Sequence, residues 1–146
     1  RQEEIYSHPA TEFVGGFIGS PPMNFLECSL VSKRDRLVLD AGAFHLDVTE
    51  LQNQIRERFS GSEVALGIRP EDITLAESEA SGTFVAEVYV VEPLGSETII
   101  NLKVGEKVVK VKSMDTLKLD PGDRVSLSFD RTRMRVFDKK TGRLIF

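Results

Sequence analysis

The sequence predicts a mainly β domain built around a closed or nearly closed antiparallel barrel, and three observations support this fold class. Roughly nine or ten short segments alternate apolar and polar residues with the two-residue period of a strand. Turn-forming residues separate them at close intervals, as in the DPGD sequence at residues 120–123. Helical spacing of apolar residues occurs in two short segments. Short strands with frequent turns favour a barrel over a sandwich of long strands.

The first predicted element is a short helix over residues 11–18, with Thr11 as its N-cap. Its apolar residues lie at helical spacing: Phe13, Val14, Phe17 and Ile18. Gly15 and Gly16 weaken the helix but leave a flat surface that another backbone can approach. Because Gly19 ends the helix and Pro21-Pro22 prevents its continuation, the chain turns here and enters a strand.

From Met23 onward the period changes to two. The strands are expected at residues 24–31, 36–40, 43–48, 64–68, 83–93, 97–104, 106–112, 125–129, 133–138 and 142–146. A second helix interrupts them at residues 49–59, where Leu51, Ile55 and Phe59 form one apolar face. Thr49 and Gln52 have the spacing of a capping box at its start.

The composition indicates one globular domain. The 146 residues include 40% hydrophobic and 29% charged residues, and no apolar run approaches the length of a membrane span. The single cysteine, Cys28, excludes an internal disulfide and fits a reducing, cytoplasmic location. Because the chain begins with Arg1 and lacks an initiator Met, we expect it to be a piece of a longer protein.

The charge is unevenly distributed. Residues 123–146 hold seven Lys/Arg and three Asp, so the net charge of −4 leaves −8 on residues 1–122. A basic end on an acidic body could bind nucleic acid or could be a solvated pair of strands. The cations stand beside a predicted hairpin with few aromatic residues among them, which disfavours a nucleic-acid partner.

Signatures of catalysis are absent from the sequence. It contains no GxxxxGK[ST] phosphate loop, and no GxGxxG follows a strand. His8 and His45 are far apart, and no Cys or His pair has metal-ligand spacing. His45 is expected to face solvent from a strand, and Cys28 to be a half-buried strand thiol without a base partner. The sequence therefore predicts no catalytic, cofactor-binding or metal-binding residue.

Two turns are candidate contact sites. The first, GIRPED, contains Gly67, Arg69, Pro70 and Glu71, and either ends a strand with charges facing water or contacts a partner. The second, VEPLGSET, contains Glu92, Gly95 and Glu97 in a bend between two strands. A Gly-Ser turn can present N–H groups to an anion, but the flanking glutamates would repel one, which favours a plain turn.

The same motifs carry a family resemblance that runs from Glu3 to Phe146. In order along the chain these are EEIYSHPATEFVGGFIGSPPMNF, LGIRPEDI, VYVVEPLGSETII, GDRVSLSFD and RVFDKKTGRLI. This pattern resembles the C-terminal regulatory region of sugar-importer ABC ATPases, the group typified by the maltose-transporter ATP-binding subunit.

The resemblance implies an OB-type barrel, the transport-associated OB module, over residues 23–146, with an inserted β-subdomain at roughly residues 63–129. Residues 1–22 would be a helical hinge from a missing ATPase domain, which would hold ATP and Mg²⁺. Such subunits form a homodimer beneath two membrane-spanning subunits, and their regulatory regions touch each other. Some members also receive a regulatory protein. The chain itself should therefore catalyse no reaction, and the parent would be peripheral on the inner face of the membrane.

The resemblance also assigns candidate roles to residues. The hinge and interdomain positions would be Phe13, Gly15, Gly16, Phe17, Gly19, Ser20, Pro21, Met23 and Asn24. The regulatory or dimer contacts would be Gly67, Arg69, Pro70, Glu71, Glu92, Gly95 and Glu97. An alternative function is an effector-binding module for a sugar or an oxyanion, because barrel mouths are common ligand sites. The absence of Trp and the presence of two Tyr disfavour a sugar.

Overall fold

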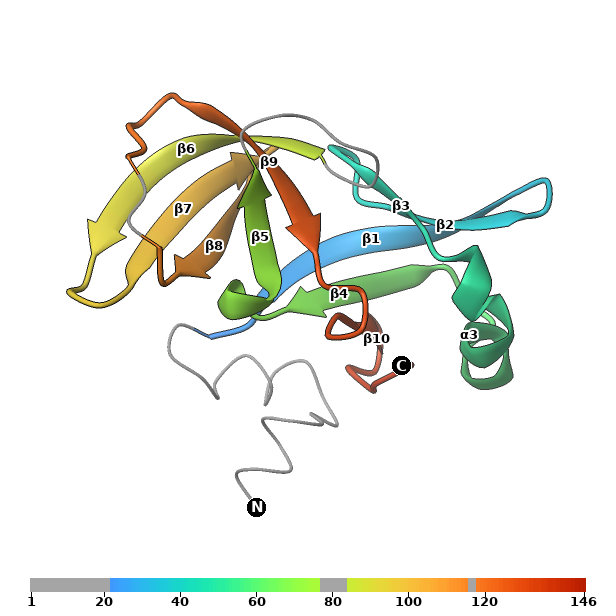
Figure 1. Cartoon of the computed structure of the whole chain (residues 1–146). Coiled ribbons are helices and arrows are strands. Elements are labelled where there is room, and N and C mark those ends of the chain that lie inside the picture. Colours follow the sequence, from blue (N-terminus) through green and yellow to red (C-terminus); the bar gives the residue numbers. More distant parts are fainter. Residues whose placement is uncertain (1–21, 77–83, 116–117) are drawn as a thin grey trace, which may run out of the picture. The chain divides into compact units, whose positions relative to one another are not determined.

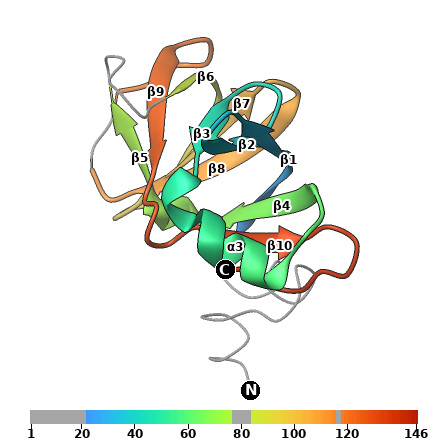
Figure 2. The same ribbon diagram turned by 90° about the vertical axis from the view of Figure 1, so that its right-hand side faces the viewer.

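The computed structural model describes residues 22–76, 84–115 and 118–146. Within these residues ten strands form two antiparallel five-stranded sheets (Figures 1 and 2). The prediction of a mainly β, OB-like fold is confirmed. The helix predicted at residues 11–18 and the hinge positions from Phe13 to Pro21 lie outside the described residues.

The first sheet has the spatial order β10-β4-β1-β2-β3. Its strands are β1 (Asn24–Lys33), β2 (Arg36–Asp40), β3 (His45–Asp47), β4 (Glu63–Ile68) and β10 (Arg135–Asp138). A hairpin joins β1 to β2, with Lys33 opposite Arg36. The chain's last strand, β10, returns to pair with β4, with Phe137 opposite Ala65.

The second sheet has the order β5-β9-β6-β7-β8. Its strands are β5 (Ile73–Ala76), β6 (Phe84–Pro93), β7 (Thr98–Val104), β8 (Lys107–Ser113) and β9 (Arg124–Phe129). Strands β5 and β8 stand at opposite ends of this hydrogen-bonded order. Strand β8 nevertheless contacts β5 and the 3₁₀ turn η2 (Pro70–Asp72). The sheet therefore curls back on itself as a nearly closed barrel.

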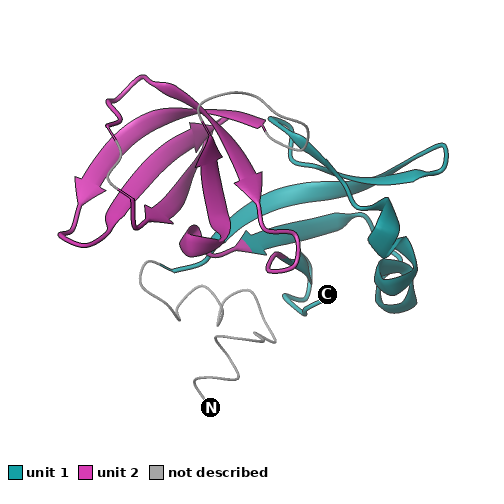
Figure 3. Cartoon of the chain, in the orientation of Figure 1, with its two compact units in different colours: residues 1–67, 135–146 teal, residues 68–134 magenta. Residues whose placement is uncertain are grey.

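These sheets belong to two compact units (Figure 3). Unit 1 contains residues 1–67 and 135–146, and unit 2 contains residues 68–134. The sequence placed an inserted subdomain at roughly residues 63–129, a range that overlaps most of unit 2. Strand β4 supplies a central strand of the unit 1 sheet, which keeps residues 63–67 in that unit.

The helix predicted at residues 49–59 starts differently from the expectation. A 3₁₀ turn, η1 (Thr49–Leu51), precedes α3 (Gln52–Arg58). The prediction of a capping box at Thr49 is wrong. Asp47 Oδ1 accepts hydrogen bonds from the Thr49 N–H at 2.9 Å and from the Thr49 hydroxyl at 2.6 Å. Thr49 Oγ1 also accepts from the Leu37 N–H, so tertiary contacts occupy the presumed cap. The predicted apolar face of this helix is observed, with Ile55 fully buried.

Two other details correct the sequence-based expectations. Residues 142–146 form no strand, because only isolated bridge positions occur there, such as Leu144 opposite Phe137. Strand β5 was not anticipated, since four residues are too few to show a period. Cys28 is 4% exposed and thus fully buried, which raises the pKa of its thiol to about 12. His45 is exposed, as expected, beside Asp40.

Candidate functional site

Apart from Gly67, which is in unit 1, the two candidate turns lie in unit 2, where local hydrogen bonds shape them. In the first turn, Pro70 begins η2, and the Asp72 N–H donates to the Arg69 carbonyl at 2.9 Å. The fixed φ of proline suits this first helical position. Pro70 is buried while Glu71 is exposed, so the turn presents its acidic residue outward.

The second turn joins β6 to β7. The Leu94 N–H donates to the Glu97 carbonyl at 2.8 Å, and Gly95 has φ +81 with open space around it. Leu94 is 56% exposed at the tip of this turn. A single exposed apolar side chain is ordinary, but Met114, which is 69% exposed, lines a hollow beside the same turn.

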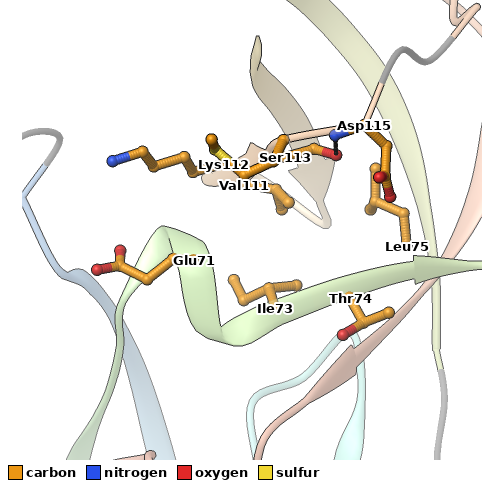
Figure 4. A pocket seen from close by; sticks show the side chains of 9 residues that line it. Glu71, Ile73, Thr74, Leu75, Val111, Lys112, Ser113 and Asp115 are labelled. Carbon is orange, nitrogen blue, oxygen red and sulfur yellow. Dashed lines mark hydrogen bonds between the residues drawn. The ribbon is translucent and has the colours of Figure 1, made fainter. Parts of the chain in front are cut away.

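Strand β8 brings the two turns to one end of the unit. A pocket of about 490 Å³ lies between η2–β5 and the end of β8 (Figure 4). Glu71 and Ile73 line one side, and Lys112 and Met114 line the other. In Figure 4 the Glu71 and Lys112 side chains extend in the same direction from facing elements.

A smaller hollow of about 280 Å³ adjoins this pocket. Pro93, Gly95 and Ser96 line it from the second turn, and Met114 and Asp115 line both hollows. The ammonium of Lys112 lies 3.2 Å from the Glu97 carboxylate, which ties β8 to the second turn. Glu71, Gly95, Glu97, Leu94, Lys112 and Met114 are called the turn surface below.

Several predicted contact residues lie elsewhere. Gly67 is buried in β4, where an added Cβ would stand 2.7 Å from the Met23 sulfur and 2.9 Å from the Phe137 ring. Its lack of a side chain therefore serves core packing. The interdomain candidates Met23 and Asn24 are 6% and 8% exposed.

Glu92 serves a polar network on the sheet. Its carboxylate accepts a 2.7 Å hydrogen bond from the amide of Asn101, which is 5% exposed. The Asn101 carbonyl oxygen accepts in turn from Lys110 Nζ at 2.6 Å. This chain of contacts crosses β6, β7 and β8 and satisfies a buried amide.

The electrostatics of the first turn centre on Asp72. Burial raises the pKa of its carboxyl above the ordinary value, and the nearby Glu71 raises that pKa further. The guanidinium groups of Arg69 and Arg133 oppose this rise. Asp130 differs, because hydrogen bonds from Thr132 lower the pKa of its carboxyl.

The chemistry that the site can perform is limited. The pocket is lined by apolar residues and by polar groups of mixed sign: Glu71, Thr74, Lys112, Ser113 and Asp115. No aromatic ring lines it for stacking on a sugar. Within residues 22–76, 84–115 and 118–146, no group of three His, Cys, Asp or Glu side chains is arranged to hold a metal ion. No helix in this part of the chain is long and apolar enough to cross a membrane.

Sequence reasoning missed three members of the turn surface: Leu94, Lys112 and Met114. Leu94 could have been noticed as a large apolar residue inside a turn. Lys112 and Met114 carry no such signal, because only the pairing of β8 with β7 places them beside the turn.

The fold defines an OB-type domain. Comparison with known proteins agrees. The family model of the MalK OB fold domain matches residues 19–73, and that of the TOBE domain matches residues 66–137. The chain belongs to this family of OB and TOBE domains of MalK-type ATP-binding proteins, and both domains are non-catalytic parts of such proteins.

Curated relatives carry the same match over nearly the whole chain. The trehalose/maltose import ATP-binding protein MalK of Thermococcus litoralis is 38% identical over 99% of this chain and 40% of its own length. The multiple sugar-binding transport ATP-binding protein MsmK of Streptococcus mutans is 38% identical over 95% of the chain and 38% of its own length. The chain thus spans about two fifths of these relatives.

Among solved structures, the chain resembles the cytoplasmic molybdate-binding protein ModG. The TM-score is 0.54 at 12% identity, over 77% of this chain and 94% of that one. At this identity the likeness concerns the fold alone.

Proposed function

We propose that this chain is the regulatory and dimerisation domain of the ATP-binding subunit of an ABC importer for sugars. The names of its relatives support the importer class. The observation that carries the contact role is the turn surface, where exposed Leu94 and Met114 stand beside the Glu97–Lys112 ion pair. Apolar side chains rimmed by charges are the usual composition of a protein–protein contact.

The rest of the subunit follows from this assignment. An ATPase domain elsewhere in the parent protein would bind ATP and Mg²⁺, and residues 1–22 would link it to the OB region. The parent would lie in the cytoplasm against transporter membrane subunits. Its two copies would be held together partly through this region while the ATPase domains open and close, and a regulatory protein would use the same surface.

Sedimentation equilibrium of the 146-residue chain from micromolar to millimolar concentration tests the dimerisation role. We expect a reversible dimer, weakened by Glu71→Lys and by Glu97→Gln. Glu57→Lys, at an exposed position on α3, is the control and should leave the dimer unchanged. A strict monomer up to millimolar concentration would exclude dimerisation by this domain alone.

A second candidate function is supported by the 490 Å³ pocket itself. Lys112, Thr74 and Ser113 offer donors to a small oxyanion there, while Glu71 and Asp115 oppose its charge. Calorimetric titration with sulfate distinguishes the two functions. Saturable heat that disappears in Lys112→Ala would support effector binding, and the absence of heat alongside a dimer would support the contact role.

A further inference from the structure

Two hollows adjoin in unit 1, between the end of α3 and the turn that follows β10. The first has a volume of about 600 Å³ and the second of about 500 Å³, within the range of small-molecule sites. Arg58, Phe59 and Asp138 line both, so the two are parts of one surface, called the paired hollows here. The surface includes the RVFDKKTGRLI motif, to which the turn surface of unit 2 gives no role.

Backbone and side-chain hydrogen bonds hold the elements around the paired hollows together. Strand β10 pairs with β4, and beyond this pairing the Lys139 N–H donates to the Glu63 carbonyl at 3.3 Å. At the end of α3, the guanidinium of Arg58 donates to the Ile145 carbonyl at 3.4 Å. The surface is therefore assembled by the fold before any ligand arrives.

The turn after β10 is closed by three hydrogen bonds to Asp138. Its N–H donates to the Arg143 carbonyl at 2.8 Å, and its carbonyl accepts from the Gly142 N–H at 2.7 Å. Its carboxylate Oδ1 accepts from the Lys140 N–H at 2.8 Å. Lys140, Thr141 and Arg143 thus extend into water from a backbone that is already ordered.

Phe59 supplies an aromatic ring to both hollows. Its N–H donates to the Ile55 carbonyl at 2.9 Å where α3 ends, and its side chain is half-buried. A Cβ added to Gly61 would stand 2.7 Å from the tip of this ring, so a side chain at position 61 would displace it. Half-buried Leu144 and buried Ile145 extend the apolar floor of the first hollow. The paired hollows therefore offer apolar carbon to one face of a ligand.

Three exposed cationic side chains surround this floor: Arg58, Lys140 and Arg143. In the part of the chain that the structure describes, neither the Lys140 ammonium nor the Arg143 guanidinium forms an ion pair. The hydroxyl-bearing side chain of Thr141 lies beside the two arginines in the first hollow. Such a set of donors suits a phosphate group.

Two carboxylates determine what else the ligand must carry. Glu63 accepts a 2.8 Å hydrogen bond from the Ser29 hydroxyl and lines the second hollow together with Asp138. An ionised carboxylate accepts further hydrogen bonds, but it repels a second negative charge. A ligand with hydroxyl groups over the second hollow and its phosphate at the arginines of the first satisfies both requirements.

We propose that the paired hollows bind a sugar phosphate. Its phosphate accepts hydrogen bonds from Arg58 and Arg143. Its sugar ring packs against Phe59, and its hydroxyls donate to Asp138 and Glu63. The site lies in unit 1 and requires no dimer, so it goes beyond the function proposed above. Transfer of a phosphoryl group to a sugar hydroxyl supplies such a ligand, and only a link between this ligand and import rests on the proposed function.

Two-dimensional NMR titration of the full 146-residue chain with glucose 6-phosphate and glucose 1-phosphate tests the proposal. At least one of them should cause saturable shifts of the amide signals of residues 58–63 and 138–145, with a dissociation constant below about 1 mM. Glucose and inorganic phosphate should each bind at least about tenfold more weakly, because each makes one of the two sets of contacts.

Substitutions separate the two ends of the ligand. Arg143→Gln should weaken binding of the sugar phosphate at least about tenfold and leave the binding of glucose unchanged. Phe59→Leu should weaken the binding of both. Lys33→Gln removes an exposed cation at the end of β1 and is the matched control, which should change neither dissociation constant. The amide spectrum verifies each fold, and exposed Arg143 carries the test if Phe59→Leu unfolds.

Four outcomes would overturn the proposal. The first is no saturable shift with either sugar phosphate up to about 10 mM. The second is equal affinity for inorganic phosphate, which would indicate unspecific contact of an anion with exposed cations. The third is tighter binding of adenosine 5′-monophosphate, and the fourth is saturable shifts confined to unit 2. Because none of these outcomes depends on self-association, the sedimentation experiment tests the dimerisation role separately.

Discussion

The two units differ in the solvent exposure of their large apolar side chains. In the described part of unit 1 every large hydrophobic residue is buried or half-buried, and Met23, Ala65 and Phe137 pack into one cluster with Phe25 and Leu144. Unit 2 also has a filled barrel, yet it exposes Tyr89, Val90, Leu94, Val108 and Met114. Because exposed apolar surface costs free energy in water, its concentration in unit 2 supports the contact role proposed for that unit.

The largest expected effect comes from deleting one aromatic ring in each unit. Phe137 is fully buried and packs edge-on against Phe25, with ring centroids 5.7 Å apart. Phe137→Ala should lower the free energy of unfolding by about 3–5 kcal/mol. Tyr89→Ala should lower it by less than about 1 kcal/mol, because Tyr89 is 50% exposed and loses mainly its contact with the Lys103 ammonium. Urea unfolding measures both effects, and equal losses of stability would contradict the contrast between the units.

A smaller effect is expected at two hairpin loops that begin with a left-handed residue. The β1–β2 loop of unit 1 uses Arg34 at φ +56, and the β7–β8 loop of unit 2 uses Gly105 at φ +62. Arg34→Gly should raise the free energy of unfolding by about 0.5–1 kcal/mol, because glycine adopts this φ without strain. Gly105→Ala should lower it by about 1–2 kcal/mol. Thermal unfolding checks both, and Arg34→Ala, which keeps the strain, should show no gain.

The smallest effect concerns two carboxyl groups with opposite pKa shifts. Hydrogen bonds from Thr49 and the nearby Arg36 lower the pKa of Asp47 in unit 1 from 3.8 to about 2. Its contribution to stability is therefore present above the unfolded pKa and is lost as pH falls from about 4 to about 2. In unit 2, burial raises the pKa of Asp72, so its ionised form destabilises the fold above the unfolded pKa, and acidification relieves this cost.

Urea unfolding as a function of pH distinguishes these groups. Asp47→Asn should lower the free energy of unfolding at neutral pH. It should also reduce the decrease in that free energy between about pH 4 and pH 2. Asp72→Asn should raise stability at neutral pH. Because the Asp47 side chain is 40% exposed, added salt should reduce its effect. Identical pH profiles for the two variants would contradict the assigned shifts.

The sequence anticipated the elements whose signals are local. The alternation of Val64, Leu66 and Ile68 identified β4, and the DPGD turn forms with the Asp123 N–H donating to the Asp120 carbonyl at 3.0 Å. The face containing Ile55 was also found. These features depend on near neighbours in the chain, so composition and spacing are enough to predict them.

Other assignments failed because distant residues decide them. Thr49 looked like a cap, but Leu37 and Asp47 engage its side chain. Gly67 looked like part of a contact turn, but Met23 and Phe137 leave no room for a side chain there. Asp47 lies only two residues from Thr49, but Leu37, Met23 and Phe137 are brought close by strand pairing, which a local pattern does not contain.

The sequence by itself determined the mainly β fold class, the approximate strands and the family motifs, because a period of two and turn residues act within a few positions. Only the tertiary structure decided which surfaces are available for contact. The pairing of β6, β7 and β8 and the bulge at Tyr89 gather Val90, Val108 and the charges of three strands onto one face. Register and bulges arise from contacts between strands, and a one-residue shift reverses which side chains meet water.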